Sequence, residues 1–275
     1  MVKANAVLVT LDLRDNQIKK EGVMALLDAL KDSSIENEGA LAISETLKVN
    51  TTLANLNLEY NKIGNEGAFA LSEVLKTNTT LTIMYLGNKK IGNQGILAFS
   101  DALKVNQTLT SLNLIWNSIG KERAFALSEA LKTNKALTNL SLWNNSIGNE
   151  GALALSETLK VNTALTSLDL GSNLIGKKGA LALSEVLKVN TTLTDLSLGD
   201  NKVGNGGAIA FSEALKTNKA LTNLNLFRNL IGNEGAPVLL EVLKINIALT
   251  RLELSHMLIA KEVSLAISET LRTRH

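Results

Sequence analysis

The 275-residue chain has no cysteine and one proline, and aromatic residues make up only 3% of it. Without cysteine it forms neither a disulfide nor a thiolate-ligated metal site, which is typical of proteins in a reducing compartment. We therefore expect a cytoplasmic protein. No apolar run approaches the roughly 18 residues of a membrane span, and the start shows no signal-peptide pattern, so we expect no membrane partner.

Residues that commonly carry catalysis are also scarce. The chain has two histidines, His256 and His275, and it lacks a glycine-rich phosphate loop with its lysine and any metal-ligand spacing. We therefore expect no enzyme, no catalytic residue, no cofactor and no metal site. Although the net charge is +2, acidic residues outnumber basic ones at the positions between the strand leucines. Nucleic acid binding needs a basic groove, so we expect no nucleic-acid partner.

The main feature of the sequence is a repeat of 28 residues. A leucine marks each repeat, at Leu53, Leu81, Leu109, Leu137, Leu165, Leu193, Leu221 and Leu249. A period of this length predicts a solenoid. Within each unit the spacing of apolar residues changes from two to four, which predicts a short strand followed by a helix. We expect a single domain over residues 1–275, with about nine full repeats and one truncated repeat at 32–50.

The truncated repeat lacks a strand segment. Leu8 of the first repeat lies 45 residues before Leu53, which is 11 residues short of two periods. One interpretation is that a strand was deleted, which predicts a break in the sheet. The other is that the printed sequence lacks 11 residues between Ser34 and Ile35, which predicts room for a strand between Leu13 and Leu58.

Asparagine recurs at three positions of the repeat. Those at helix starts, such as Asn65, are predicted to cap their own helices, and those after the strands to bind backbone groups of the turn. Those at the helix-to-strand turn precede Ser or Thr as in glycosylation sites, but we interpret them as left-handed turn residues: Asn50, Asn78, Asn106 and Asn190. On the helices, Glu73 and Lys76 and their counterparts are predicted to pair on the outward face.

The pattern LxxLxLxxNxIxxxGxxxLxxxL, as in 165–187, resembles the ribonuclease-inhibitor class of leucine-rich repeats. It is similar to the repeat domains of NOD-like receptors. The resemblance implies an α/β horseshoe with parallel strands on the concave face and helices on the convex face. Stacked strands are about 4.8 Å apart and helices about 8–10 Å, which favours the same curvature. Unlike ribonuclease inhibitor the chain has no cysteine, and unlike the Ran GTPase activator it has no acidic tail, so no functional residue is transferred.

All four tyrosines and tryptophans occupy positions that should face away from the core: Tyr60, Tyr85, Trp116 and Trp143. Aromatic residues are enriched at binding hot spots, so we predict that these four form one exposed patch. The candidate partner-binding residues are Glu59, Tyr60, Tyr85, Ile115, Trp116, Trp143, Asn144, Phe227 and Arg228. The alternative is drift at unconstrained positions. The pattern is also broken nearby, at Met84, Lys89 and Arg123.

We therefore expect a non-enzymatic protein–protein interaction module that binds an unidentified protein through its concave face, as a monomer or with weak self-association. Three alternatives stay open. The chain is a ligand-sensing fragment of a larger receptor or effector, a GTPase-activating scaffold resembling the Ran activator, or a repeat array with no dedicated ligand.

Overall fold

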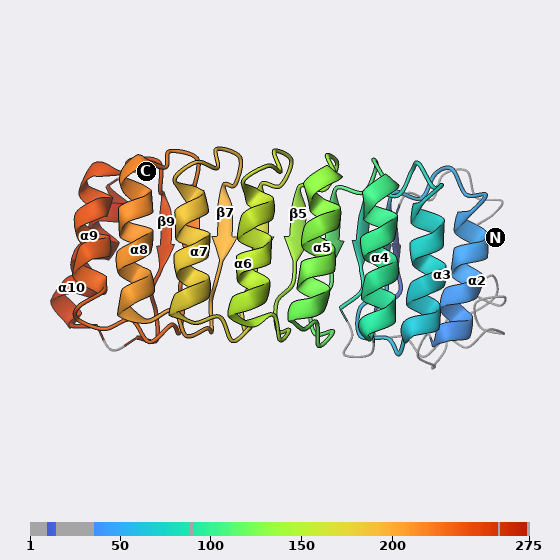
Figure 1. The fold of residues 1–275 in the computed structure, drawn as a ribbon, viewed down its shortest axis with the longest axis horizontal. Helices are drawn as coiled ribbons and strands as arrows, with labels where there is room; N and C mark the ends of the chain where they lie inside the picture. Colours follow the sequence, from blue (N-terminus) through green and yellow to red (C-terminus); the bar gives the residue numbers. More distant parts are fainter. Residues whose placement is uncertain (1–9, 15–35, 88–90, 258, 274–275) are drawn as a thin grey trace. The chain divides into compact units, whose positions relative to one another are not determined.

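The computed structural model describes residues 10–14, 36–87, 91–257 and 259–273 (Figure 1). The chain forms two compact units: unit 1 comprises 1–119 with 129–141, and unit 2 comprises 120–128 with 142–275. The division falls within helix α5 (Lys121–Thr133). The expected single domain over the whole chain stays a prediction, as does the horseshoe curvature.

Unit 1 alternates short strands with helices. Its strands are β1 (Thr10–Asp12), β2 (Asn55–Asn57), β3 (Ile83–Tyr85), β4 (Ser111–Asn113) and β5 (Asn139–Ser141). Its complete helices are α2 (Asn37–Leu47), α3 (Asn65–Leu75) and α4 (Asn93–Val105). The strands are parallel and pair in chain order, so that Leu56, Met84 and Leu112 stand opposite one another.

Unit 2 is built in the same way. Its strands are β6 (Ser167–Asp169), β7 (Asp195–Ser197), β8 (Asn223–Asn225) and β9 (Arg251–Glu253). Its complete helices are α6 (Gly148–Leu159), α7 (Lys177–Leu187), α8 (Gly204–Thr217), α9 (Ala236–Ile245) and α10 (Lys261–Arg272). These strands are also parallel and pair in chain order. The predicted α/β leucine-rich-repeat solenoid is confirmed.

Leucine burial explains why each repeat folds alike. From β2 to β9 the central residue of each strand is buried, while its two neighbours point to the opposite side, because side chains alternate along a strand. In β1 the central residue, Leu11, is half-buried. Met84 takes the place of a strand leucine and is fully buried, so it serves as a core residue. Arg123, in the place of a helix glycine, is half-buried.

Glycine at the first turn lets successive helices approach closely. A Cβ atom on Gly67 would lie 2.8 Å from the Ala40 Cβ of the preceding helix, and one on Gly207 would lie 2.9 Å from the Ala180 Cβ. Carbon atoms do not pack at such distances, so a side chain here would push the helices apart. The close spacing therefore keeps the apolar faces of the helices buried against each other.

Asparagines at the helix starts do not cap their own helices, so that prediction is wrong. The Asn37 Oδ1 accepts hydrogen bonds from the amides of Gly64 (2.8 Å) and Gly67 (3.1 Å), at the start of the next helix. Asn149 likewise binds the amides of Gly176 and Gly179, both at 2.9 Å. The physical reason is that the stacked helices place each asparagine beside the unpaired amides of the following repeat.

Asparagines of the helix-to-strand turn also form hydrogen bonds within their own turn and with the preceding repeat. They are buried, and the Asn106 φ of −70° is not left-handed, so the predicted conformation is wrong. The Asn106 Oδ1 accepts from the amides of Thr108 (3.0 Å) and Leu109 (2.8 Å). Its Nδ2 donates to the Leu75 carbonyl of the preceding repeat (2.6 Å). Because the buried side-chain amide both accepts and donates hydrogen bonds, these asparagines have a structural role, as interpreted from the sequence.

The asparagines after the strands form the predicted ladder. The Asn173 Nδ2 donates to the Gly171 carbonyl (2.9 Å) of its own turn and to the Leu142 carbonyl (2.8 Å) of the preceding repeat. These bonds satisfy carbonyls that a tight, buried turn would leave unpaired. Lys89, expected to interrupt the ladder, lies outside the described residues.

The region around the truncated repeat differs from both interpretations. Strand β1 pairs directly with β2, with Leu11 opposite Leu56, and the Leu13 amide donates to the Asn57 carbonyl (2.8 Å). Neither a break in the sheet nor room for another strand exists between them, so both structural predictions are wrong. An unpaired strand edge gains hydrogen bonds by pairing with the next available strand. The truncated repeat supplies helix α2, which packs on α3.

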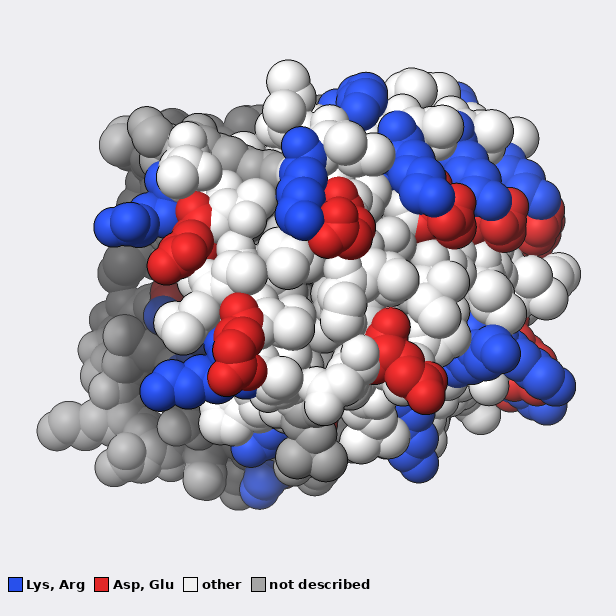
Figure 2. All heavy atoms as spheres, turned by 90° about the vertical axis from the view of Figure 1, so that its left-hand side faces the viewer, with Lys and Arg blue, Asp and Glu red and all other residues white. Residues whose placement is uncertain are grey.

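The outward faces of the helices carry rows of ion pairs, as the spacing predicts. The pairs join residues three apart on helices α2 to α9 or at their C-terminal ends: Glu45–Lys48, Glu73–Lys76, Asp101–Lys104, Glu129–Lys132, Glu157–Lys160, Glu185–Lys188, Glu213–Lys216 and Glu241–Lys244. Figure 2 shows acidic and basic side chains adjacent in a row at its upper right. Exposed pairs of this kind contribute little to stability.

Candidate functional site

The surface that differs from repeat to repeat lies on the side of the strands opposite the helices. We call it the strand face: the outward side chains of each strand, together with the two residues before the asparagine that follows it. The second of these two residues has a left-handed backbone, with φ between 50° and 59°, at Tyr60, Trp116, Asn144, Ser172, Asp200, Arg228 and His256. For residues other than glycine this conformation costs about 1 kcal/mol or more.

Hydrogen bonds between repeats hold this conformation. The Tyr60 amide donates to the Gly87 carbonyl (2.8 Å), and the Asn144 amide donates to the Gly171 carbonyl (2.9 Å). The same backbone bond recurs where the side chain is tyrosine, asparagine, serine, aspartate or arginine. The turn therefore fixes the backbone and leaves the side chain free to differ.

In unit 1 the predicted contact residues come from three successive repeats. Tyr60 follows β2 and is 56% exposed, while Tyr85 on β3 and Ile115 and Trp116 after β4 are half-buried. Ile115 lies over Gly87, because a Cβ on that glycine would stand 2.4 Å from the Ile115 Cγ1. Three repeats thus place apolar side chains on one face, and the missing side chain at Gly87 makes the room.

Glu59 is the exception among these residues, because it is buried with 8% exposure. Its Oε1 accepts a hydrogen bond from the Asn113 Nδ2 (2.8 Å), which lies two repeats further on. A Cβ on Gly87 would lie 3.1 Å from the same oxygen, so the carboxylate crosses the repeat between them above that glycine. Burial raises the pKa of Glu59 above its usual 4.5, while Arg14 lowers the pKa and Asp12 raises it.

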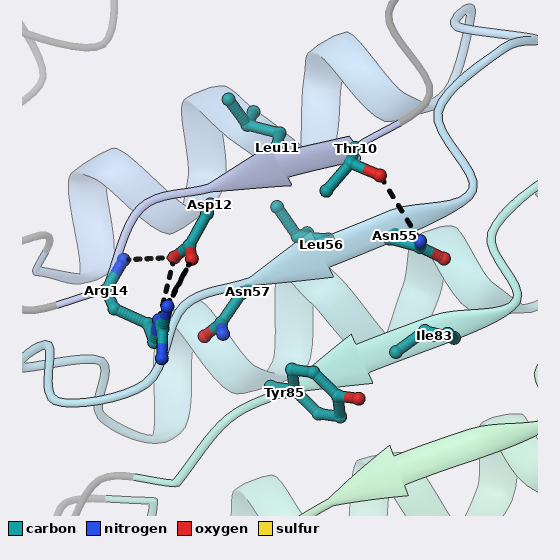
Figure 3. A pocket seen from close by; sticks show the side chains of 9 residues that line it. All are labelled: Thr10, Leu11, Asp12, Arg14, Asn55, Leu56, Asn57, Ile83 and Tyr85. Carbon is teal, nitrogen blue, oxygen red and sulfur yellow. Dashed lines mark hydrogen bonds and ion pairs between the residues drawn. The ribbon is translucent and has the colours of Figure 1, made fainter.

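A hollow of about 270 Å³ lies on the strand face of unit 1 (Figure 3). It is lined by Thr10, Leu11, Asp12, Arg14, Asn55, Leu56, Asn57, Ile83 and Tyr85. Asp12 and Arg14 form an exposed ion pair with 2.7 Å between the Asp12 Oδ2 and the Arg14 Nη2. The hydrogen bond with Arg14 is the main reason why the pKa of Asp12 is lowered.

Arg14 connects the hollow to Glu59 and Tyr60. Its pKa is raised, first by the hydrogen bond to Asp12 and, more weakly, by electrostatic interaction with Glu59 and Tyr60. The guanidinium therefore lies within electrostatic reach of both side chains. Sequence reasoning did not select Asp12, Arg14 or Asn113 as site residues. The sequence feature that could have indicated this site is Gly87. It occupies the same repeat position as Glu59 and Ile115 but has no side chain, so it leaves space between them.

Unit 2 holds the other predicted contact residues. The Trp143 indole lies over Gly171, where a Cβ would be 2.4 Å from the Trp143 Cδ1. Asn144 is exposed. Near the C-terminal end, the Arg228 Cζ lies 5.0 Å from the Phe227 ring centre, and the His256 ring meets Phe227 edge-on at 5.2 Å between ring centres. His256 was not selected from the sequence.

The four aromatic residues of the predicted patch are divided between the two units. Tyr60, Tyr85 and Trp116 share the strand face of unit 1, whereas Trp143 belongs to unit 2. The single patch of four aromatic residues stays a prediction.

Two further features concern the part of the chain that the structure describes. Across 10–14, 36–87, 91–257 and 259–273, no three His, Cys, Asp or Glu residues are grouped so that they could hold a metal ion. None of the helices within these ranges combines the length and the apolar character that crossing a membrane requires.

No curated protein matches the chain. The actin-binding site 2 of leiomodin-1 is similar in structure over 54% of this chain and 86% of its own, with 25% identity and a TM-score of 0.48. The C-terminal domain of a Caenorhabditis elegans tropomodulin is similar over 65% of this chain and 92% of its own, with 19% identity and a TM-score of 0.46.

The family assignment rests on the repeat itself. The family model described as "Leucine Rich repeat" matches six segments, which together cover a little more than half of the chain: 4–27, 49–72, 105–128, 133–156, 161–184 and 189–212. Similarity to NOD-like receptors stays a prediction. On the strength of these matches and of the alternating strands and helices, the chain belongs to the leucine-rich repeat family.

Proposed function

We propose that the chain is a protein-interaction module that binds its partner through the strand face of unit 1. The observation that carries the proposal is the group of apolar and aromatic side chains at Tyr60, Tyr85, Ile115 and Trp116 on an outward face. The fold is held by the buried leucines, so these side chains are not required to build the core. Tyrosine and tryptophan bury much surface at low entropy cost, which suits a binding hot spot.

The arrangement also favours a preorganised surface. Trp116 and Tyr60 are fixed by a repeated turn, and Ile115 packs over Gly87, so little ordering remains to be done on binding. Rigid surfaces lose less entropy when a partner binds. The remaining predicted contacts, Trp143, Asn144, Phe227 and Arg228 on unit 2, belong to the same proposal as a second contact area.

The proposal is tested by separating binding from folding. Trp116→Ala and Tyr60→Ala are compared with Glu73→Ala, a matched truncation on the outward helix face. Partner capture from the host's extract is quantified for each variant, and thermal melts are recorded alongside. We expect the aromatic variants to weaken capture by about tenfold or more, with melts close to wild type.

Two results would contradict the proposal. If Trp116→Ala and Tyr60→Ala keep full capture while folded, the strand face of unit 1 is not the contact surface. If both unfold the chain, the side chains belong to the core and their outward placement is incorrect.

A further inference from the structure

Glu59 carries a negative charge in a place where the fold gives it little compensation. Its side chain is buried, and among the described residues its carboxylate accepts a hydrogen bond from the neutral amide of Asn113. Taking a carboxylate out of water is costly unless opposite charge or several donors replace the water. This cost is visible in the raised pKa of Glu59, for which burial is the largest cause.

The neighbouring ion pair does not remove the cost. Arg14 stabilises the Glu59 carboxylate, but Asp12 opposes it, and the two act together because Arg14 is bonded to both oxygens of Asp12. The pair has no net charge. Among the described residues, Glu59 therefore has an incompletely balanced charge, and its neighbour in the chain, Tyr60, is exposed on the strand face.

The side chains around Glu59 suit a cation. Tyr60 is its neighbour in the chain, and Tyr85 lies on β3, which stands between β2 and the Asn113 donor on β4. Tyrosine rings attract ammonium and guanidinium groups through their faces. A hollow on the same strand face is lined by Asn57 and Tyr85 and offers space for a long side chain (Figure 3).

We propose that Glu59 receives a lysine or arginine side chain of the partner protein, with Tyr60 and Tyr85 forming the aromatic rim of that position. This inference rests on the proposed function and deepens it, because it names the chemistry that the strand face of unit 1 recognises. Docking of the cation supplies the positive counter-charge that the Glu59 carboxylate lacks in the free protein, which makes the contact specific for a basic residue.

The test uses immobilised pools of short random peptides whose central residue is fixed as lysine, arginine, norleucine or glutamate. Binding of the full chain is measured for wild type, Glu59→Gln, Glu73→Gln and Trp116→Ala. The Glu59→Gln variant removes the charge but keeps an oxygen that accepts from Asn113. Glu73→Gln is the matched control, because it removes a carboxylate from an exposed pair with Lys76 on α3.

We expect wild type and Glu73→Gln to bind the lysine or arginine pools about tenfold more tightly than the norleucine pool. In Glu59→Gln that preference should fall to about twofold or less, with thermal melts that show a folded chain. The glutamate pool should bind most weakly to wild type.

Three outcomes would overturn the inference. If the basic preference persists in Glu59→Gln, another carboxylate carries it. If all pools bind equally and Trp116→Ala abolishes binding, the strand face binds peptide without charge recognition, so the proposed function stands alone. If no pool binds, cation recognition is rejected, and capture of the natural partner by Trp116→Ala then decides the proposed function separately.

Discussion

In unit 1 the acidic residue Glu59 is buried beside Asn113, whereas in unit 2 the acidic residue Asp200 is exposed and accepts a hydrogen bond from the Ser172 hydroxyl (2.7 Å). The two residues occupy adjacent positions in equivalent turns of different repeats. The side chain of Asp200 leaves the turn from the left-handed residue, while that of Glu59 comes from the residue before it and crosses Gly87. A shift of one residue position within the turn thus changes an acidic side chain from solvent-exposed, as in Asp200, to buried, as in Glu59.

Glycine in the neighbouring repeat is the second factor in this comparison. In unit 1, Gly87 makes room for Glu59 and Ile115, and in unit 2, Gly171 makes room for the Trp143 indole. The two units therefore share a backbone and use glycine in the same way, but different side chains fill the space, Glu59 and Ile115 in unit 1 and Trp143 in unit 2.

The largest effect should come from the core, where the two units are equivalent. Leu56→Ala in unit 1 and Leu168→Ala in unit 2 remove side chains with 0% and 1% exposure. Each should lower the free energy of unfolding by about 2–5 kcal/mol through the cavity left behind. Denaturant melts measure this, with the surface change Ser172→Ala as a control expected within about 0.5 kcal/mol of wild type. Equal effects at Leu168 and Ser172 would show that the strand faces are misassigned.

A smaller effect should follow from filling the glycine gaps. In Gly87→Ala and Gly171→Ala the new methyl group would meet Ile115 or Trp143 at 2.4 Å, so we expect a loss of about 1–3 kcal/mol. In Gly199→Ala the nearest atoms belong to the Asn225 amide at 3.3 Å, and we expect little change.

Tryptophan fluorescence sharpens this test, because Gly171→Ala should shift the Trp143 signal while Gly87→Ala should not. Adding Trp143→Ala to Gly171→Ala should recover most of the lost stability. If all three glycine variants behave alike, the gaps are not what accommodates the large side chains.

A loss of about 0.5–2 kcal/mol should follow from removing a cap between repeats. Asn149→Ala deletes the acceptor for the Gly176 and Gly179 amides, which open α7. Hydrogen exchange should therefore accelerate at the start of α7 and stay unchanged at the start of α6, where Asn149 itself resides. Ser146→Ala, an exposed neighbour, serves as the control. Faster exchange in α6 alone would restore the view that each asparagine caps its own helix.

The smallest effect should appear in the pH dependence of unit 1. Because the pKa of Glu59 is raised on folding, its contribution to stability is present below pH 4.5 and is lost as the pH rises through the folded pKa. Glu59→Gln should therefore unfold less readily than wild type near pH 7 and similarly at low pH.

The pH dependence of stability that Asp12 contributes has the opposite sign to that of Glu59. Its pKa is lowered by Arg14, so its contribution is present above 3.8 and is lost as the pH falls through the folded pKa. Asp12→Asn should be less stable than wild type near pH 7. Urea melts across the pH range measure both variants, and a shared sign would contradict the assigned burial of Glu59.

Much of the fold followed from the sequence because its signals lie within one repeat. The alternation around Leu168, the change to helical spacing and the ladder role of Asn173 each depend on residues a few positions apart, and each agrees with the structure. The outward placement of Tyr60 followed in the same way. The burial of Glu59 did not, since it depends on Gly87 and Asn113, which are 28 and 54 residues further on.

By itself, the sequence determined the period, the type of each element and the identity of the buried leucines, since a strand or helix must bury its apolar side whatever its neighbours are. The tertiary structure decided which groups meet between repeats. It directed Asn149 to the next helix, joined β1 to β2 across 45 residues and enclosed the carboxylate of Glu59. Those outcomes depend on how the repeats stack, because each partner is supplied by a different repeat and its approach is set by the packing between them.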